Sequence, residues 1–166
     1  MPTLIRCENG AFAAAEDPFT RVADDQELPQ GDVIISLQRF LNDGERLIGQ
    51  HRAVGVVLKS SEEVAALSID LAKVAVVALD FPAFRDGRAY TQARLLRERY
   101  GFEGEVRAVG DVLREQVGFM LRCGFDAFEP ADGASCEDLA MAARRQRHVY
   151  QRAADGRRPA FAEREA

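Results

Sequence analysis

Charged side chains gather where an apolar run passes into a helical pattern. The run Val74–Leu79 is typical of a buried strand, and Asp80 and the stretch Arg85-Asp86-Gly87-Arg88 follow it. The free N–H groups of a helix start and guanidinium side chains both bind phosphate, sulfate, sulfite or carboxylate. We therefore predict an anion site around this junction, formed by Arg85, Arg88, Arg94, Arg107 and Tyr90.

Asp86 offers a different interpretation of the same helix start. Its carboxylate is placed to accept hydrogen bonds from the first N–H groups of the helix, which an external anion would otherwise occupy. The arginines would then pair with Asp86, and the junction would be structural. We expect Asp86 to be the cap, with Arg85, Arg88 and Arg94 free to face a ligand or a partner.

Other charged residues follow neighbouring predicted strands, namely Lys59, Asp111 and Glu129. The carboxyl ends of parallel strands meet at one edge of a sheet, where ligands bind. In an enzyme, Asp80 or Asp111 would be the catalytic acid or base and Arg85, Arg88 or Arg107 the anion clamp. The plainer interpretation is that strand ends simply reach water, and for Lys59 and Glu129 it has equal weight.

Arg107 is the one charged residue within an otherwise apolar stretch of its predicted strand. Burying an unpaired guanidinium is costly, so the side chain must meet a carboxylate or reach water. We expect a structural pair, with Asp80 or Asp111 as its partner.

Short apolar runs alternate with helical patterns from Asp32 onward, which is typical of βα units with a parallel sheet. The predicted strands are Val33–Ser36, Val54–Leu58, Val74–Leu79, Glu105–Val109 and Asp126–Glu129. The predicted helices are Leu37–Ile48, Ser61–Leu71, Arg88–Tyr100, Val112–Cys123 and Cys136–Gln151. Gly101-Phe102 and Gly124-Phe125 each follow a helix, which suits a left-handed glycine with a phenylalanine packing back on the last turn.

The predicted fold is α/β, with about five consecutive βα units forming a mainly parallel, curved, half-barrel-like sheet; the alternative is an open flavodoxin-like sheet. We expect one domain over residues 1–166: an N-terminal β extension (1–31), a βα core (32–152) and a flexible tail (153–166). The extension would contain two antiparallel strands, Thr3–Cys7 and Phe19–Val22. A half barrel leaves an edge or an apolar face open, so we expect a homodimer.

Composition restricts the class of protein. The 166 residues carry a net charge of -5, which argues against general nucleic-acid binding. No signal peptide or membrane segment is expected. The three cysteines form no CxxC and the two histidines are not spaced with them as metal ligands, so we predict free thiols, a reducing cytoplasmic location and no metal. No nucleotide-binding or nucleophile motif is present, and no cofactor is evident.

A basic run, Arg144-Arg145-Gln146-Arg147-His148, stands out in this acidic chain. One interpretation is a surface for an acidic partner. The other is a solvated final helix with its positive residues favourably placed near its C-terminus, which we prefer.

The stretch from Leu79 to Glu129, with DFPAFRDGRAYTQARLLRERYG, GDVLREQ and RCGFDAF, resembles a bacterial family known only as domain of unknown function 934. Members are often labelled probable oxidoreductases, and their genes commonly lie beside that of the sulfite (or nitrite) reductase haemoprotein. The resemblance implies an accessory protein of assimilatory sulfate and sulfite reduction, acting through contacts with the reductase haemoprotein or by binding a small oxyanion. The alternative is an enzyme acting on a small anionic substrate at the strand ends.

Overall fold

The computed structural model describes residues 3–67 and 70–164. One eight-stranded sheet runs through these residues in the order β2-β1-β8-β7-β6-β5-β4-β3. The strands are β1 (Leu4–Glu8), β2 (Ala11–Ala15), β3 (Thr20–Arg21), β4 (Val33–Ser36), β5 (Val54–Leu58), β6 (Val76–Phe81), β7 (Glu105–Gly110) and β8 (Ala127–Phe128). The helices are α1 (Leu37–Ile48), α2 (Arg88–Arg94), α3 (Val117–Cys123), α4 (Cys136–Arg144) and α5 (Ala160–Glu163). Shorter helical turns are η1 (Val64–Leu67), η2 (Leu71–Lys73), the π-helical η3 (Leu95–Arg99) and η4 (Arg114–Gln116).

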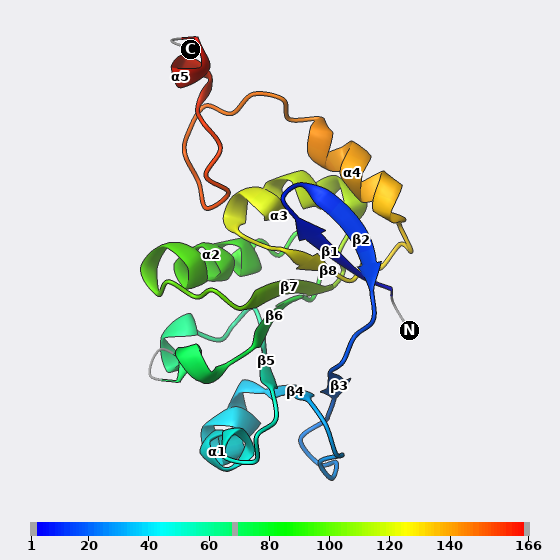
Figure 1. Cartoon of the computed structure of the whole chain (residues 1–166), viewed down its shortest axis with the longest axis vertical. Helices are drawn as coiled ribbons and strands as arrows, with labels where there is room; N and C mark the ends of the chain where they lie inside the picture. The colour runs from blue at the N-terminus through cyan, green and yellow to red at the C-terminus, as the bar shows by residue number, and fades with distance from the viewer. Residues whose placement is uncertain (1–2, 68–69, 165–166) are drawn as a thin grey trace.

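Strands β3 to β8 pair in parallel, and β1 pairs antiparallel with both β2 and β8. The predicted half-barrel-like α/β fold with an antiparallel N-terminal extension is therefore confirmed. Along β6, side chains alternate between two apolar layers. Val77, Leu79 and Phe81 pack in the core beneath the helices, whereas Val76 and Ala78 are buried on the opposite, inner face. Figure 1 shows α1 and α2 on one side of the strands and the N-terminal segment on the other.

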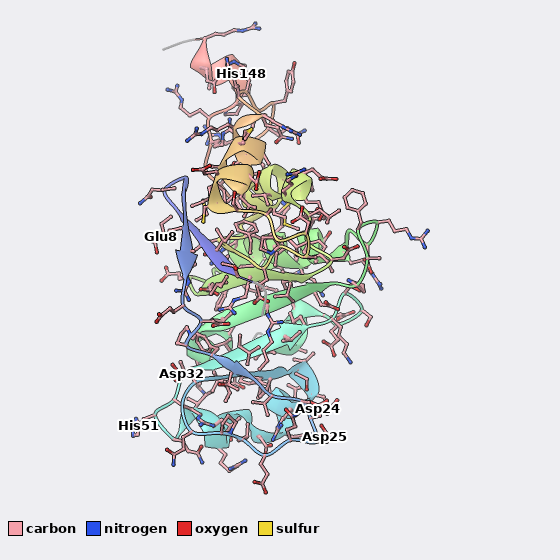
Figure 2. All side chains as sticks on the ribbon, turned by 90° about the vertical axis from the view of Figure 1, so that its right-hand side faces the viewer. Glu8, Asp24, Asp25, Asp32, His51 and His148 are labelled. Atoms are coloured by element: carbon pink, nitrogen blue, oxygen red, sulfur yellow. The ribbon has the colours of Figure 1, made fainter. Side chains whose placement is uncertain are left out.

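The inner face is crossed by the segment between β2 and β3, residues 16–19, which we call the N-terminal linker. β2 and β3 are the two outermost strands of the sheet, yet only these four residues join them. A link this short spans at most roughly 18 Å, so the sheet must curl until its edges approach each other. The linker is visible in Figure 1 as the blue chain descending from β2 to β3, and it lies on the side of the molecule that faces the viewer in Figure 2.

The N-terminal strands differ from the prediction. The strand Thr3–Cys7 corresponds to β1, but its hairpin partner is Ala11–Ala15 instead of Phe19–Val22. Residues 20–21 instead pair in parallel with β4 at the far edge. The hairpin turn is tight because Asn9 and Gly10 both adopt a positive φ, so β2 begins directly after it.

Several predicted helices are shorter or divided. The helix expected over Ser61–Leu71 is replaced by the turns η1 and η2; residues 68 and 69 of that prediction lie outside the described part. The helix predicted over Cys136–Gln151 corresponds to α4 and ends at Arg144. The stretch predicted as Arg88–Tyr100 begins as α2 and continues as the π-helical η3. The expected tail contacts the core through an ion pair between Arg122 and Asp155 and contains α5.

Both predicted glycine helix ends are present. Gly101 and Gly124 have φ of +62° and +100°, and the N–H groups of Phe102 and Phe125 bond back to Leu96 and Met120. Both phenylalanines are buried. Within the described residues, no helix has the length and apolar character needed to cross a membrane.

Candidate functional site

Of the predicted site residues, Asp80, Asp111 and the Arg85–Arg88 stretch lie at the carboxyl end of the parallel strands, whereas Arg94, Arg107 and Tyr90 do not join them in one site. Asp80 is near the end of β6, Asp111 follows β7, and the Arg85–Arg88 stretch enters α2. The loops meet there because the Asp111 N–H donates to Phe81 O at 2.7 Å. We call this end of the sheet the rim.

Asp86 occupies the start of α2, as expected. Its Oδ1 accepts from the Arg88 backbone N–H at 3.2 Å, and its Oδ2 accepts from the Ser60 hydroxyl at 2.9 Å. The Arg88 guanidinium turns back onto the same carboxylate, with Nη2 2.6 Å from Oδ2. Hydrogen bonding to Arg88 holds the pKa of Asp86 well below its usual range. The internal carboxylate therefore fills the place that an external anion would take.

The expectation that Arg88 and Arg94 are both free is wrong. Arg88 is paired with Asp86, and Arg94 forms an exposed pair with Glu98, four residues further along the chain, at 3.0 Å. Both guanidiniums are exposed, so these pairs contribute little stability.

Arg85 and Phe84 form the outermost part of the loop between β6 and α2, and we call them the rim tip. Phe84 is 51% exposed, and Arg85 is exposed without a hydrogen bond or ion pair to any residue of the described ranges. The loop beneath them is fixed from two sides. The Asp111 carboxylate accepts from the Phe84 N–H at 2.7 Å, and the Asp86 N–H donates to Ala83 O at 2.9 Å. The role of Asp111 in this structure is thus to hold the loop.

Tyr90 points away from the arginines into an aromatic cluster. Its ring lies 5.2 Å from that of Phe81 and 4.8 Å from that of Phe119, both edge to face. Burial raises the pKa of the Tyr90 hydroxyl, which interacts with the Gln116 side chain. The cluster anchors α2 to the sheet, so Tyr90 is a packing residue here.

Asp80 differs from the other rim carboxylates. Its side chain belongs to the inner face, and within the described ranges it has no hydrogen bond and no ion pair. Burial raises its pKa, and Asp86 adds to the shift, while Arg21 and Lys59 oppose it. A carboxyl with this environment holds its proton to higher pH than usual, which suits proton transfer.

Arg107 lies fully buried on the inner face at the centre of a charge network. Its Nε donates to Glu105 at 2.7 Å, Nη1 to Asp17 at 2.6 Å and to Glu129 at 3.2 Å, and Nη2 to Asp17 at 3.1 Å. The pairing was predicted but the partners were wrong, because Asp80 and Asp111 take no part. Burial works against the charged form, but the carboxylates outweigh it and raise the pKa of Arg107.

The network extends in both directions across the sheet, to β1 beside one edge strand and to β3 at the other edge. Arg6 of β1 pairs with Glu105 at 2.7 Å, and Arg21 of β3 pairs with Glu129. Neither arginine was singled out from the sequence. One available signal was the alternation Glu105-Val106-Arg107, which places both charged residues on one face of a strand. No comparable pattern marks Asp17, which lies in the N-terminal linker.

One protein family matches most of the chain. The profile of a family described as "Bacterial protein of unknown function (DUF934)" matches residues 55–161, which covers β5 to the start of α5 and includes the whole rim loop. No curated protein matches the chain. Since the matched stretch is well over half of the 166 residues, the chain belongs to the DUF934 family of bacterial proteins of unknown function.

Proposed function

We propose that this protein is an accessory protein of assimilatory sulfite reduction that acts by binding a partner protein through the rim tip. One observation carries the proposal. An exposed phenylalanine and an exposed, unpaired arginine stand side by side on a loop that side chains from other segments hold in place.

The residue types at the rim tip fit a protein contact. Aromatic residues and arginine are enriched at the energetic centres of protein interfaces. A loop already fixed by Asp111 and Asp86 loses little conformational entropy when a partner binds, which favours affinity. Packing alone gives no reason to expose Phe84 while fixing its backbone so firmly.

The assignment to sulfite reduction rests on the family resemblance, in which neighbouring genes encode the reductase haemoprotein. That haemoprotein is the proposed partner, and a cytoplasmic location follows from it. The oxyanion form of the proposal has less support, because Arg88 and Arg94 already face carboxylates, and of the three arginines Arg85 alone has no partner among the described residues.

Copurification tests the proposal. The protein is recovered from cells growing with sulfate as sulfur source, in parallel with a Phe84→Ala/Arg85→Ala variant. The control is Leu41→Ala/Arg46→Ala, which removes an exposed apolar residue and an exposed arginine from α1. We expect the wild type and the control to recover the haemoprotein and the rim-tip variant to lose most of it. If the wild type recovers none, and deletion of the gene leaves growth on sulfate unchanged, the proposal is wrong.

A second candidate function is proton transfer to or from a small anionic substrate at Asp80. The favouring observation is its raised pKa and its lack of a bonded partner within the described chain. Titration of labelled protein with sulfite and sulfate, followed by NMR, tests this candidate. Shifts of the Asp80 carboxyl signal that disappear in Arg21→Gln support a substrate held there. Signals that stay unchanged in wild type rule out both ions as substrates.

A homodimer remains part of the proposal. β2 is an edge strand, and the sequence Ala11-Phe12-Ala13-Ala14-Ala15 carries no charge that would discourage pairing with a second copy. Light scattering of the wild type and of Ala13→Lys measures this directly. A dimer lost in the lysine variant supports pairing through β2, and a monomeric wild type excludes it.

A further inference from the structure

A groove lies on the part of the molecule where the β1–β2 hairpin turn meets α3 and α4. One hollow of about 510 Å³ is lined by Gly10 and Phe12 of the hairpin, Leu121 of α3 and Arg144, Arg147 and Arg157. A second hollow of about 450 Å³ shares Gly10, Leu121 and Arg157 with the first, so the two form one continuous depression. We call it the basic groove.

The basic groove lies at the opposite end of the strands from the rim. Its second hollow is lined by Cys7, Gly124 and Phe125, which lie beside or just before the start of β8. The rim tip follows the end of β6. The two surfaces are therefore separate.

The charge of the first hollow is not compensated. Three arginines line it and no aspartate or glutamate does, in a chain whose net charge is -5. The guanidiniums of Arg144 and Arg147 have no hydrogen bond or ion pair to any other residue in the described ranges, and both residues are exposed. In the second hollow, which Arg157 also lines, Arg97 is already paired with Asp126 and Asp155 with Arg122.

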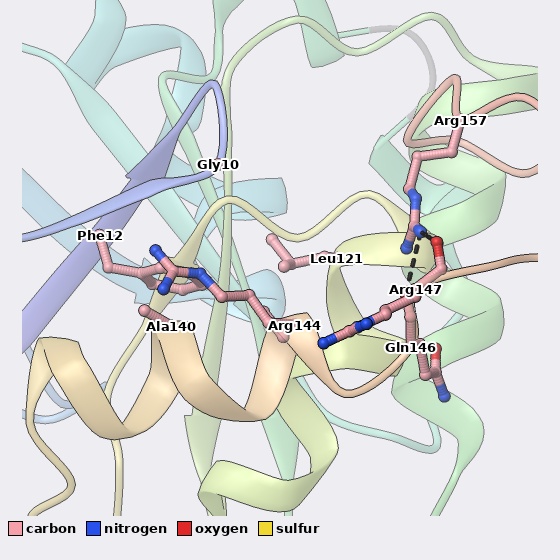
Figure 3. Close-up of a pocket in the computed structure, with 9 residues that line it drawn as sticks. Gly10, Phe12, Leu121, Ala140, Arg144, Gln146, Arg147 and Arg157 are labelled. Atoms are coloured by element: carbon pink, nitrogen blue, oxygen red, sulfur yellow. Dashed lines mark hydrogen bonds between the residues drawn. The ribbon is translucent and has the colours of Figure 1, made fainter.

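Arg157 is held in a fixed position. Its Nη2 donates to Gln146 O at 2.9 Å and to Arg147 O at 2.6 Å, the contacts drawn in Figure 3. These bonds fix the loop after α4 and leave the other guanidinium nitrogens available. The same view shows Arg144 extending along the groove toward Phe12. The cationic groups thus line an apolar floor of Phe12, Leu121 and Ala140.

We propose that the basic groove binds an acidic, amphipathic segment of a partner protein. Carboxylates of the segment pair with Arg144, Arg147 and Arg157, and its apolar side chains cover Phe12 and Leu121. The apolar floor favours a peptide over a compact inorganic anion, which would use the arginines alone. Exposed Arg145, Arg152 and Arg158 extend the positive field around the groove and accelerate encounter with an acidic partner.

Fluorescence anisotropy of the full chain with synthetic 14-residue peptides tests the proposal. The probes are peptides of glutamate and leucine, with the leucines spaced for one apolar face either in a helix or in an extended chain. In the matched control peptides, serine replaces each leucine. All measurements are made at about 0.15 M salt, where non-specific charge effects are screened. We expect the glutamate–leucine peptides to bind and the serine peptides to bind about tenfold more weakly, because the floor contact is lost.

Two protein variants with equal loss of charge locate the binding. Arg144→Gln/Arg147→Gln removes the groove cations, and Arg145→Gln/Arg152→Gln removes two exposed cations that do not line the groove. We expect the first to weaken binding at least tenfold and the second to change it less than threefold. Equal effects of the two variants, or no binding of any probe below 1 mM, would overturn the proposal. Displacement of the peptide by inorganic triphosphate at equal charge would also overturn it, in favour of a phosphate ligand.

Discussion

Arg107 and Asp17 are 90 positions apart in the sequence, yet Nη1 and Nη2 of the arginine reach the two carboxylate oxygens at 2.6 and 3.1 Å. The pair joins β7, in the middle of the sheet, to the N-terminal linker that crosses its inner face. It therefore fixes the only four residues between the two outermost strands. The linker that requires the sheet to curl also supplies a carboxylate to the buried Arg107.

Replacement of Arg107 by methionine should destabilise the protein by about 3 kcal/mol, because it leaves buried carboxylates without their shared partner. Arg6 and Arg21 still compensate Glu105 and Glu129, which limits the loss. Asp17→Asn keeps the shape and should cost about 1 kcal/mol. Urea unfolding of both variants checks the order. A smaller loss for Arg107→Met than for Asp17→Asn would show that the network does not centre on Arg107.

The parallel core could be predicted because its signals are local. Apolar β-branched runs alternate with helical patterns, and Gly-Phe pairs terminate two helices, so β4 to β8 and the ends at Gly101 and Gly124 follow from neighbouring residues. The stretch 61–71 misled the prediction because Ser61 and the following glutamates resemble a helix start. In the described part of that stretch the chain forms only the short turns η1 and η2.

The remainder depends on long-range contacts that a sequence pattern does not encode. β3 has two residues and is defined only by its pairing with β4, from which 11 residues separate it. The partners of Arg107 lie up to 90 positions away, and Asp17 carries no periodic signal. The rim arginines were identified by residue type alone. Whether a guanidinium meets an internal carboxylate depends on side-chain direction, as Arg88 and Asp86 illustrate.

Replacement of Asp80 by asparagine should stabilise the protein at neutral pH and have little effect at pH 3. Burial raises the pKa of Asp80 in the folded state, so the folded protein binds its proton more tightly than the unfolded chain does. Stability due to this group is therefore present at low pH and is lost as pH rises through the folded pKa. Thermal melts of wild type and Asp80→Asn between pH 3 and 8 measure the difference. A variant less stable than wild type at pH 7 would contradict the expected sign.

Replacement of Asp86 by asparagine should show the opposite pH dependence. Hydrogen bonding to Arg88, to the Arg88 N–H and to Ser60 lowers the pKa of Asp86, so its contribution is present above the unfolded pKa and disappears as the folded protein is acidified. The variant should melt below wild type at pH 7, and the two melting temperatures should converge at strongly acidic pH. Asp80→Asn, on the same rim, is the natural control because its difference from wild type has the reverse sign. A pH-independent difference for Asp86→Asn would mean that shape, and not charge, determines its role.

Gly124 and Gly101 follow their helices in the same way but differ in what surrounds them. Both have a positive φ, so alanine at either position is strained by about 1 kcal/mol or slightly more. A Cβ at Gly101 would meet nothing within 4 Å, whereas one at Gly124 would lie 2.5 Å from Cγ of Arg97. Arg97 cannot move aside cheaply, because its guanidinium donates to Gly124 O, Phe102 O, Gly104 O and Asp126.

Gly124→Ala should therefore lower the free energy of unfolding by about 3 kcal/mol, because crowding and the loss of Arg97 contacts add to the backbone strain. Gly101→Ala should show the cost of the backbone strain alone. Urea unfolding of the two variants gives the difference directly. A Gly124→Ala/Arg97→Ala double variant separates the causes, because the clash is absent once the arginine stem is removed. Additive losses in the double variant would show that Arg97 does not crowd Gly124. If Arg97 crowds a Cβ at position 124, the double variant should be less stable than Arg97→Ala by no more than the backbone strain of about 1 kcal/mol.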